Sequence, residues 1–390
     1  MDLSHLEWPF YEDHHRAGSA AFAAWAKDHL SGFEADEGND GVAARELFLL
    51  LAQSRWLEKT VPHRDATAAT GIDLRHVCLL RELCAYSSAI ADVAFSEPWL
   101  GILPIALFGS AELKKNFISR YISGRMLPAF ALSEPHAGSD AAAIMTTARH
   151  DGHHYIINGT KSWTSNAGLA DLYIVFARHE DDREKISAFA VDGGASGIRL
   201  DERRSVLSPH TVGVWSLDNV RVAADCIVGQ RGEGFRIAMT VLELFRPTVG
   251  AATLGFARRA MDEAVSHSIT RNGFKKPIAD HQLIQAKLAQ MAVKIDAAAL
   301  LVYRAAWQHD VTKRDIGRAA AIAKYFSSEA GFDIIDEAVQ IFGGLGVVKG
   351  STVERLFRHA RAFRIFDGTS EIQQLIIARK IIADAQASNR

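Results

Sequence analysis

The sequence predicts an α+β protein, mostly α-helical, in which a β domain separates two helical domains. Helical spacing of apolar residues at both ends of the chain, and short β-branched segments bounded by turn residues between them, predict this order. We expect an N-terminal helical domain over residues 1–125, a middle β-barrel-like domain over 126–233 and a C-terminal four-helix bundle over 234–390. The order fits neither a Rossmann alternation nor a TIM barrel.

The first part of the chain has the pattern of successive helices. Residues 20–30 and 43–57 are rich in Ala and Leu at amphipathic spacing, and residues 73–95 continue the pattern. Proline removes a backbone donor and clashes inside a helix. Pro98 and Pro104 are therefore predicted to break the third helix.

The middle part has the pattern of a compact β domain of about a hundred residues. Segments 154–157 and 161–165 flank Asn158-Gly159, which is a strong signal for a hairpin turn. Further short segments predict strands at 172–177, 186–191, 212–217 and 220–222.

The last part has long apolar stripes at helical spacing. One stripe contains Ile284, Leu288, Met291, Ile295, Ala298 and Val302. A second contains Ala319, Ala323, Phe326, Ala330, Ile334 and Ile341, and residues 236–265 and 371–387 supply two more helices. Four such helices suggest an antiparallel bundle. Helices this long often pack against another subunit.

Composition excludes several classes of protein. A formal net charge of −2 argues against a nucleic-acid binder, which needs a basic face. No apolar run approaches the roughly 18 residues of a membrane span, and the polar, acidic start does not resemble a secretory signal. Three scattered cysteines indicate neither a disulfide framework nor a zinc site, and they fit a reducing cytoplasm.

Paired histidines occur twice, at His14-His15 and His153-His154. Adjacent side chains point apart on a helix or strand, so we interpret all four as surface residues and predict no metal site.

The segment 364–373 (RIFDGTSEIQ) offers one carboxylate at the expected start of a helix. Asp367 is followed by Gly368, which lets a ligand approach the backbone, and by Thr369 and Ser370, which can cap the helix. Asp367 suits a general base, or a plain charge that complements the helix dipole. Taken alone, the segment favours the dipole role.

Four further stretches change this balance. They are 130–140 (FALSEPHAGSD), 161–166 (KSWTSN), 271–274 (RNGF) with Gln282, and 340–346 (QIFGGLG). With 364–373, in this order, they closely resemble the acyl-CoA dehydrogenase family of FAD-dependent flavoproteins, and the likeness implies that family's fold. It covers nearly the whole chain and is weakest over residues 1–70.

The residue types in the first two stretches suit a flavin. Ser133 offers a hydroxyl to a ring edge, and Gly138 and Ser139 offer close backbone approach and a donor to an anionic phosphate. Trp163 can stack on the isoalloxazine ring, and Ser165 can hydrogen-bond near its N5. Singly, Gly138-Ser139 also fits an ordinary turn and Trp163 a core aromatic.

The resemblance implies the remaining cofactor contacts. At the flavin end it adds Leu132, Thr164, Thr369 and Glu371. The family shares FAD between subunits, and the residues that would reach a neighbour's FAD are Arg271, Phe274, Gln282, Gln340, Gly343 and Gly344. Two positions depart from the family pattern: Lys275 replaces a usual glycine, and His359 replaces a usual aspartate.

Substrate contacts are implied in the same way. In 242–247 (LELFRP), Glu243 and Arg246 match the positions that bind CoA, although they also fit a plain i,i+3 ion pair. Ser139 and Gly368 complete the implied substrate site.

The implied reaction is α,β-dehydrogenation of an acyl-CoA thioester. Asp367 would remove the α-proton while flavin N5 accepts the β-hydride. At the position of Asp367, relatives usually carry glutamate. Some relatives place the base instead at the position of Phe245, which cannot serve. Aspartate reaches roughly 1.5 Å less far, about one C–C bond, so we expect a bulky, branched or cyclic acyl group. Asp92 is either a second carboxylate near the acyl pocket or, as we favour, a helix-surface residue.

The resemblance also implies partners and alternatives. We expect an electron-transfer flavoprotein as acceptor, a homotetramer or homodimer, and a cytoplasmic role in fatty acid or carboxylic acid catabolism. A nitroalkane-oxidase-like enzyme is the alternative, because that relative uses an aspartate base. Glu243 and Arg246 speak against it, since a small nitroalkane needs no CoA site. The family's non-catalytic alkylation-response branch would need a basic surface and a C-terminal extension.

Overall fold

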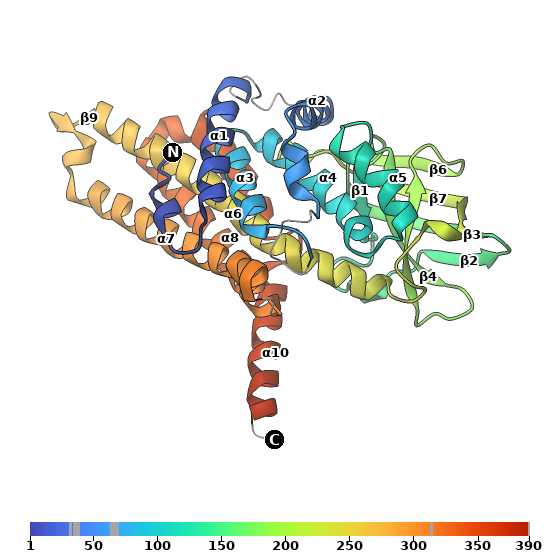
Figure 1. The fold of residues 1–390 in the computed structure, drawn as a ribbon. Helices are drawn as coiled ribbons and strands as arrows, with labels where there is room; N and C mark the ends of the chain where they lie inside the picture. Colours follow the sequence, from blue (N-terminus) through green and yellow to red (C-terminus); the bar gives the residue numbers. More distant parts are fainter. Residues whose placement is uncertain (31–32, 34–39, 63–69, 313–314, 389–390) are drawn as a thin grey trace.

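The computed structural model describes residues 1–30, 33, 40–62, 70–312 and 315–388. Helices make up both ends of the chain, and the strands of a mixed β-sheet lie between them in the sequence. Figure 1 shows the sheet at one side of the molecule, with the N- and C-terminal helices packed together beside it. The predicted fold class is confirmed.

The described residues of the N-terminal part form five α-helices and two short 3₁₀ turns. Their bounds are η1 Ser4–Glu7, α1 Asp13–His29, α2 Asp40–Gln53, η2 Trp56–Thr60, α3 Leu74–Ser87, α4 Ala89–Phe108 and α5 Ala111–Ile122. The predicted break at the two prolines is wrong. The chain breaks at Ser88, whose side chain caps α4, and Pro98 and Pro104 lie inside α4.

Burial explains why α4 tolerates two prolines. Nearly all of its residues from Ile90 to Ala106 are buried, so apolar packing offsets a cost of about 3 kcal/mol for each interior proline. Gly101 lets the helix approach strand β1 (Pro128–Ala131), since a Cβ there would lie 2.6 Å from the carbonyl carbon of Pro128.

The middle part is one mixed eight-stranded sheet. Its strands are β1 Pro128–Ala131, β2 Thr147–Asp151, β3 His154–Ser165, β4 Leu172–His179, β5 Ile186–Asp192, β6 Ile198–Arg204, β7 Val212–Ala223 and β8 Ile227–Val228. Their order is β6-β7-β3-β2-β4-β5-β8, and β1 pairs with β4. Both faces of β4 are buried: Ile174 packs toward the helices and Tyr173 into the core of the sheet.

The predicted hairpin at Asn158-Gly159 is wrong. The two segments form one continuous strand, β3, and the pair marks a bulge opposite β7. Gly159 is required because a Cβ would lie 2.4 Å from Oγ1 of Thr146. Asn158 accepts the backbone N–H of Asn219 at 2.7 Å, so it joins two strands instead of turning one.

The C-terminal part contains the four predicted long helices. They are α6 Gly234–Thr270, α7 Gln282–Trp307, α8 Gly317–Phe342 and α10 Ser370–Ser388, with an unpredicted α9 at Thr352–Phe363. A small hairpin, β9 Asn272–Gly273 and β10 Lys276–Pro277, joins α6 to α7. Short turns lie at η3 Ala141–Ala143, η4 Ala224–Cys226, η5 Ile278–Asp280, η6 Gln308–Thr312 and η7 Gly343–Val347. In Figure 1, α10 extends away from the body of the molecule.

Among the described residues, two helices, α4 and α6, are long and apolar enough to cross a membrane by length and composition alone. Buried core helices also pass this test of length and composition, so the expectation of no membrane span is not contradicted. The most apolar window of α4 is 94% buried inside the protein, which also suits a core helix.

Cys78, Cys84 and Cys226 are all free in the structure. The interpretation of the first histidine pair is wrong. His15 is buried, and the His14 and His15 rings lie 3.9 Å apart and both contact Asp73.

Candidate active site

Asp367 lies immediately before α10, in a tight turn. Its φ of 55° and the φ of 93° at Gly368 place two consecutive residues in the left-handed region, which is strained for aspartate. The turn is held by the Gly368 carbonyl, which accepts from Lys324 Nζ and from Gln373 Nε2, each at 2.9 Å. As predicted, Thr369 caps the helix by accepting the Ile372 N–H at 3.3 Å.

The surroundings of Asp367 favour a proton acceptor near neutral pH. Burial, followed by the negative charge of Glu97, raises the pKa of Asp367 to about 6, although Arg81 and Lys324 oppose the shift. A base whose pKa lies close to the working pH transfers protons efficiently. A plain helix-dipole carboxylate would instead have a lowered pKa.

Glu97, from α4, is the site residue that sequence reasoning missed. Its Oε2 accepts from Ser165 Oγ at 2.6 Å, and His210 Nε2 lies 2.9 Å from the same Oγ. Because the single hydroxyl proton of Ser165 is directed to Glu97, the His210 nitrogen acts as the donor to Ser165. Burial raises the pKa of Glu97. The available signal was a lone acidic residue among the apolar residues of 93–106.

Asp92 is buried, so the surface interpretation of this residue is wrong. It forms an ion pair with Arg81 at 2.7 Å, and Arg81 also donates to Thr248 Oγ1 at 3.0 Å. Asp92 thereby holds the Arg81 guanidinium close enough to Glu97 and Asp367 for the positive charge of Arg81 to interact with both carboxylates.

Arg246 and Glu243 lie on α6 beside this cluster. Arg246 is buried, its charge interacts with Asp367, and its Nε has no hydrogen-bond partner among the described residues. Glu243 has a raised pKa, caused first by burial and then by Asp315. An unpartnered buried guanidinium nitrogen is costly and suits an absent polar ligand.

The two predicted flavin-binding segments are joined by a buried ion pair. Lys161 Nζ donates to Glu134 Oε1 at 2.8 Å and to the Leu132 carbonyl at 3.1 Å. Glu134 also accepts the backbone N–H groups of Met145 and Thr146. Burial lowers the pKa of Lys161 to about 8. The pair fixes segment 130–140 against segment 161–166.

Several predicted flavin contacts lie open at this junction. The backbone N–H of Ser162 donates to the Ser133 carbonyl at 2.9 Å. Apart from its two chain neighbours, no described residue has an atom within 4 Å of the position that a Cβ of Gly138 would occupy. Trp163 is 54% exposed in a left-handed conformation, with Arg204 4.5 Å above its ring. An exposed tryptophan and an open glycine backbone fit a flat aromatic group with a phosphate tail. The alternative interpretations, Trp163 as a core aromatic residue and Gly138-Ser139 as an ordinary packed turn, agree less well with this exposure.

The side chain of Thr164 is not available for the predicted cofactor contact. Its hydroxyl is buried and accepts from Trp215 Nε1 at 2.9 Å, so only its backbone remains for a cofactor. Ser139 and Glu371 are exposed.

The remaining predicted cofactor residues lie at the other end of the molecule. They lie at the end of α6, in the β9–β10 hairpin, at the start of α7, at the end of α8 and in η7, and Figure 1 shows β9 far from the large sheet. All six are exposed: Arg271, Phe274, Gln282, Gln340, Gly343 and Gly344. The flavin-end residues and these six residues therefore do not form one site within a single chain. This separation is what a cofactor shared between two subunits would require.

Both departures from the family pattern have local structural consequences. Lys275 has a φ of 70°, a conformation that glycine adopts without strain, so the turn keeps its shape. His359 is buried, and burial lowers its pKa to about 3. Glu354 serves as the acidic partner instead, because it pairs with Arg358 at 2.6 Å.

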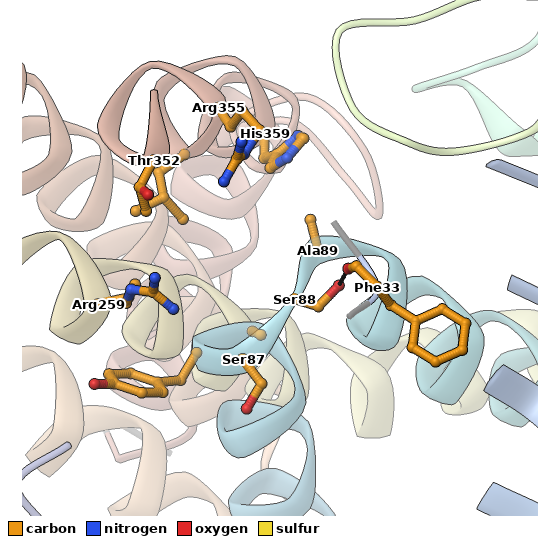
Figure 2. A pocket seen from close by; sticks show the side chains of 11 residues that line it. Phe33, Ser87, Ser88, Ala89, Arg259, Thr352, Arg355 and His359 are labelled. Carbon is orange, nitrogen blue, oxygen red and sulfur yellow. Dashed lines mark hydrogen bonds between the residues drawn. The ribbon is translucent and has the colours of Figure 1, made fainter. Parts of the chain in front are cut away.

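Figure 2 shows a separate pocket between α3, α4, α6 and α9. Arg259, Thr352, Arg355 and His359 line one side, and Ser87 to Ala89 line the other. Asp367 and Glu97 do not line it, so it is distinct from the carboxylate cluster.

Comparison with known proteins places the chain in a family. The family described as acyl-CoA dehydrogenase, C-terminal domain, matches residues 232–382, and the one described as acyl-CoA dehydrogenase, middle domain, matches residues 129–219. Cyclohexane-1-carbonyl-CoA dehydrogenase of Geobacter metallireducens is 40% identical over 79% of this chain and 82% of its own length. The 3-(aryl)acrylate reductase of Clostridium sporogenes is 37% identical over 87% and 90%.

A solved structure agrees. The acyl-CoA dehydrogenase of Bacillus anthracis, complexed with FAD, superposes with a TM-score of 0.87 at 28% identity, covering 97% of this chain and 68% of the other. Fold and relatives together define an oxidoreductase that acts on CH–CH groups. The chain belongs to the acyl-CoA dehydrogenase family.

Proposed function

We propose that the protein dehydrogenates the α,β bond of an acyl-CoA thioester, with Asp367 as base and FAD as cofactor. The observation that carries this proposal is the raised pKa of Asp367, in a cluster that Glu97 links to the flavin segment through Ser165. This network would hold the base beside the segment that binds the flavin.

Each residue of the proposed site has its own role in the reaction. Asp367 takes the α-proton, so the α-C–H electrons become available for the new double bond. FAD, held by the residues named below, would supply the acceptor for the hydride that leaves the β-carbon. Lys324 holds the Gly368 carbonyl and thus the turn that carries the base. Arg246, with its unpartnered Nε, binds the CoA portion. Trp163, Ser133, Gly138 and Ser139 hold the flavin and its phosphates.

The acyl group is proposed to be branched or cyclic. The short Asp367 side chain leaves space that a bulky α-substituent fills. A Geobacter relative named for a cyclohexane carboxylate thioester supports this class. We expect a higher kcat/KM for cyclohexanecarboxyl-CoA than for butyryl-CoA in a dye-reduction assay.

The matched control for this experiment is Asp367→Glu. The longer side chain should occupy the space of the ring, so the variant should lose cyclohexanecarboxyl-CoA turnover by a larger factor than butyryl-CoA turnover. A wild-type preference for butyryl-CoA would exclude the cyclic assignment but leave the dehydrogenase assignment intact.

The electron acceptor is proposed to be an electron-transfer flavoprotein, and the assembly a homodimer or homotetramer. Exposed apolar residues near the distal cofactor positions support assembly: Phe274, Leu283 and Val347 are each more than 70% exposed. Substrate-reduced enzyme should reoxidise slowly in air and quickly with an added electron-transfer flavoprotein. Rapid reoxidation by air alone would favour the oxidase alternative.

Replacing Glu97 by glutamine should move the acidic limb of the kcat/KM profile to lower pH. The negative charge of Glu97 helps to raise the pKa of Asp367, so its removal lets Asp367 ionise more readily. Glu97→Asp keeps the charge and should leave the limb nearer its wild-type position. A limb that stays unmoved in Glu97→Gln would show that the two carboxylates do not interact.

A further inference from the structure

A second group of potential ligands lies where α1 packs against α3, which Figure 1 shows side by side. A ring nitrogen of His14, a carboxylate oxygen of Asp73 and a ring nitrogen of His76 lie within 4.8 Å of one another. His14 comes from the first turn of α1, Asp73 is the N-cap of α3, and His76 lies in the first turn of α3. None of these residues belongs to the carboxylate cluster around Asp367.

The carboxylate of Asp73 is oriented by a fixed histidine. His15 Nδ1 accepts the backbone N–H of Glu12 at 3.0 Å, so its proton sits on Nε2. That Nε2 therefore donates to Asp73 Oδ1, 3.1 Å away. The backbone N–H of His76 donates to the same oxygen at 3.0 Å. Two donors thus occupy Oδ1, and Oδ2 is directed toward His14 Nε2 at 2.8 Å.

His76 carries an unsatisfied nitrogen in this group. The residue is 92% buried, and its Nε2 has no hydrogen-bond partner among the residues that the structure describes. Gly18 makes room for the ring, because a Cβ at that position would lie 2.6 Å from Cε1 of His76. A buried imidazole nitrogen without a partner costs free energy unless a ligand completes it.

We propose that His14, Asp73 and His76 bind a Zn²⁺ ion that ties the start of α1 to the start of α3. Two imidazoles and one carboxylate are suitable ligands for zinc, and a water molecule can fill the fourth coordination position. Solvent can reach this position because the His14 side chain is half-exposed. His15 is the positioning residue that orients the carboxylate, a role that outer partners of metal ligands commonly have. Glu12 Oε2 lies 3.7 Å from His14 Nδ1, so its negative charge is close to that imidazole.

The ligand set argues against harder cations. Calcium and magnesium prefer sites made of oxygen atoms, and this group offers only one carboxylate. Imidazole nitrogens suit zinc and its neighbours in the transition series. The site is structural rather than catalytic, since its residues lie outside the described carboxylate cluster.

The experiment uses full-length, FAD-loaded protein that has been stripped with a chelator and then dialysed. Zn²⁺ is titrated against a chromogenic chelator, and the thermal midpoint is followed with and without one equivalent. We expect one retained Zn²⁺ per chain and a midpoint that rises by several degrees, because the ion binds only the folded site. Acyl-CoA turnover should be unchanged by Zn²⁺ removal.

Three variants and one control locate the ion. His14→Gln and His76→Gln should each abolish retention, and His15→Gln should weaken it by about 10–100-fold, as loss of an outer partner does. The double variant His153→Gln/His154→Gln removes another histidine pair far from the group and should bind as wild type does. Bound FAD and circular dichroism show that each variant is folded.

The proposal is overturned if wild type retains no Zn²⁺ against the chelator, or if folded His14→Gln and His76→Gln retain it unchanged. Neither result bears on the acyl-CoA reaction, which is assayed separately in the same preparations.

Discussion

Asp367→Asn is expected to lose turnover by about 10³–10⁴-fold while it keeps FAD and still binds acyl-CoA. The amide cannot accept the α-proton, but it has nearly the shape of the carboxylic acid and fits the same left-handed turn. The measurement is single-turnover flavin reduction by the thioester, with ligand affinity measured separately by the flavin spectrum. Undiminished reduction in a flavin-loaded variant would assign the base to another residue.

The same substitution has a pH-dependent effect on stability. Burial and Glu97 raise the pKa of Asp367 from 3.8 to about 6. A raised pKa means that the folded state is favoured when the group is protonated, and this stability is lost as pH rises through about 6. At pH 8, the asparagine variant should therefore unfold at a higher temperature than wild type, by the equivalent of about 1–3 kcal/mol. The difference should shrink toward pH 4, and a constant difference would contradict the assigned pKa.

Lys161→Met is expected to destabilise the protein by about 3–5 kcal/mol and to weaken FAD retention. The substitution leaves Glu134 as a buried carboxylate that keeps two backbone donors but loses its opposite charge. The flavin segments 130–140 and 161–166 also lose their shared anchor at the Leu132 carbonyl. Thermal unfolding and FAD content after gel filtration measure the two effects.

The double variant Glu134→Gln/Lys161→Met provides the control. It removes the uncompensated charge and keeps one acceptor for the backbone N–H groups, so it should recover much of the stability lost in the single variant. Equal instability of both variants would mean that packing of the lysine stem, and not the charge, holds the segments together.

Local patterns predicted the elements that local forces determine. The stripes at 284–302 and 319–341 are α7 and α8, because a repeated apolar face specifies a helix wherever it packs. The cap at Thr369 was predictable for the same reason: donor and acceptor lie three residues apart.

Predictions failed where packing overrode a local preference. Pro98 and Pro104 remain in a helix because burial of α4 outweighs their cost. Asn158-Gly159 lies in a long strand because two neighbouring strands pair on both sides of it. The residue Glu97 could not be chosen from sequence, since its partners Ser165 and His210 are 68 and 113 positions away in the chain.

The sequence by itself determined the family, the three-part order of helices, sheet and helices, and the choice of Asp367 as the candidate base. These three depend on residue types at short spacing. Only the tertiary structure decided that Asp92 pairs with Arg81, that Glu97 helps to raise the pKa of Asp367, and that Glu134 and Lys161 join segments 130–140 and 161–166. Charges act through space, and the distance between two side chains is set by the packing of the elements that carry them.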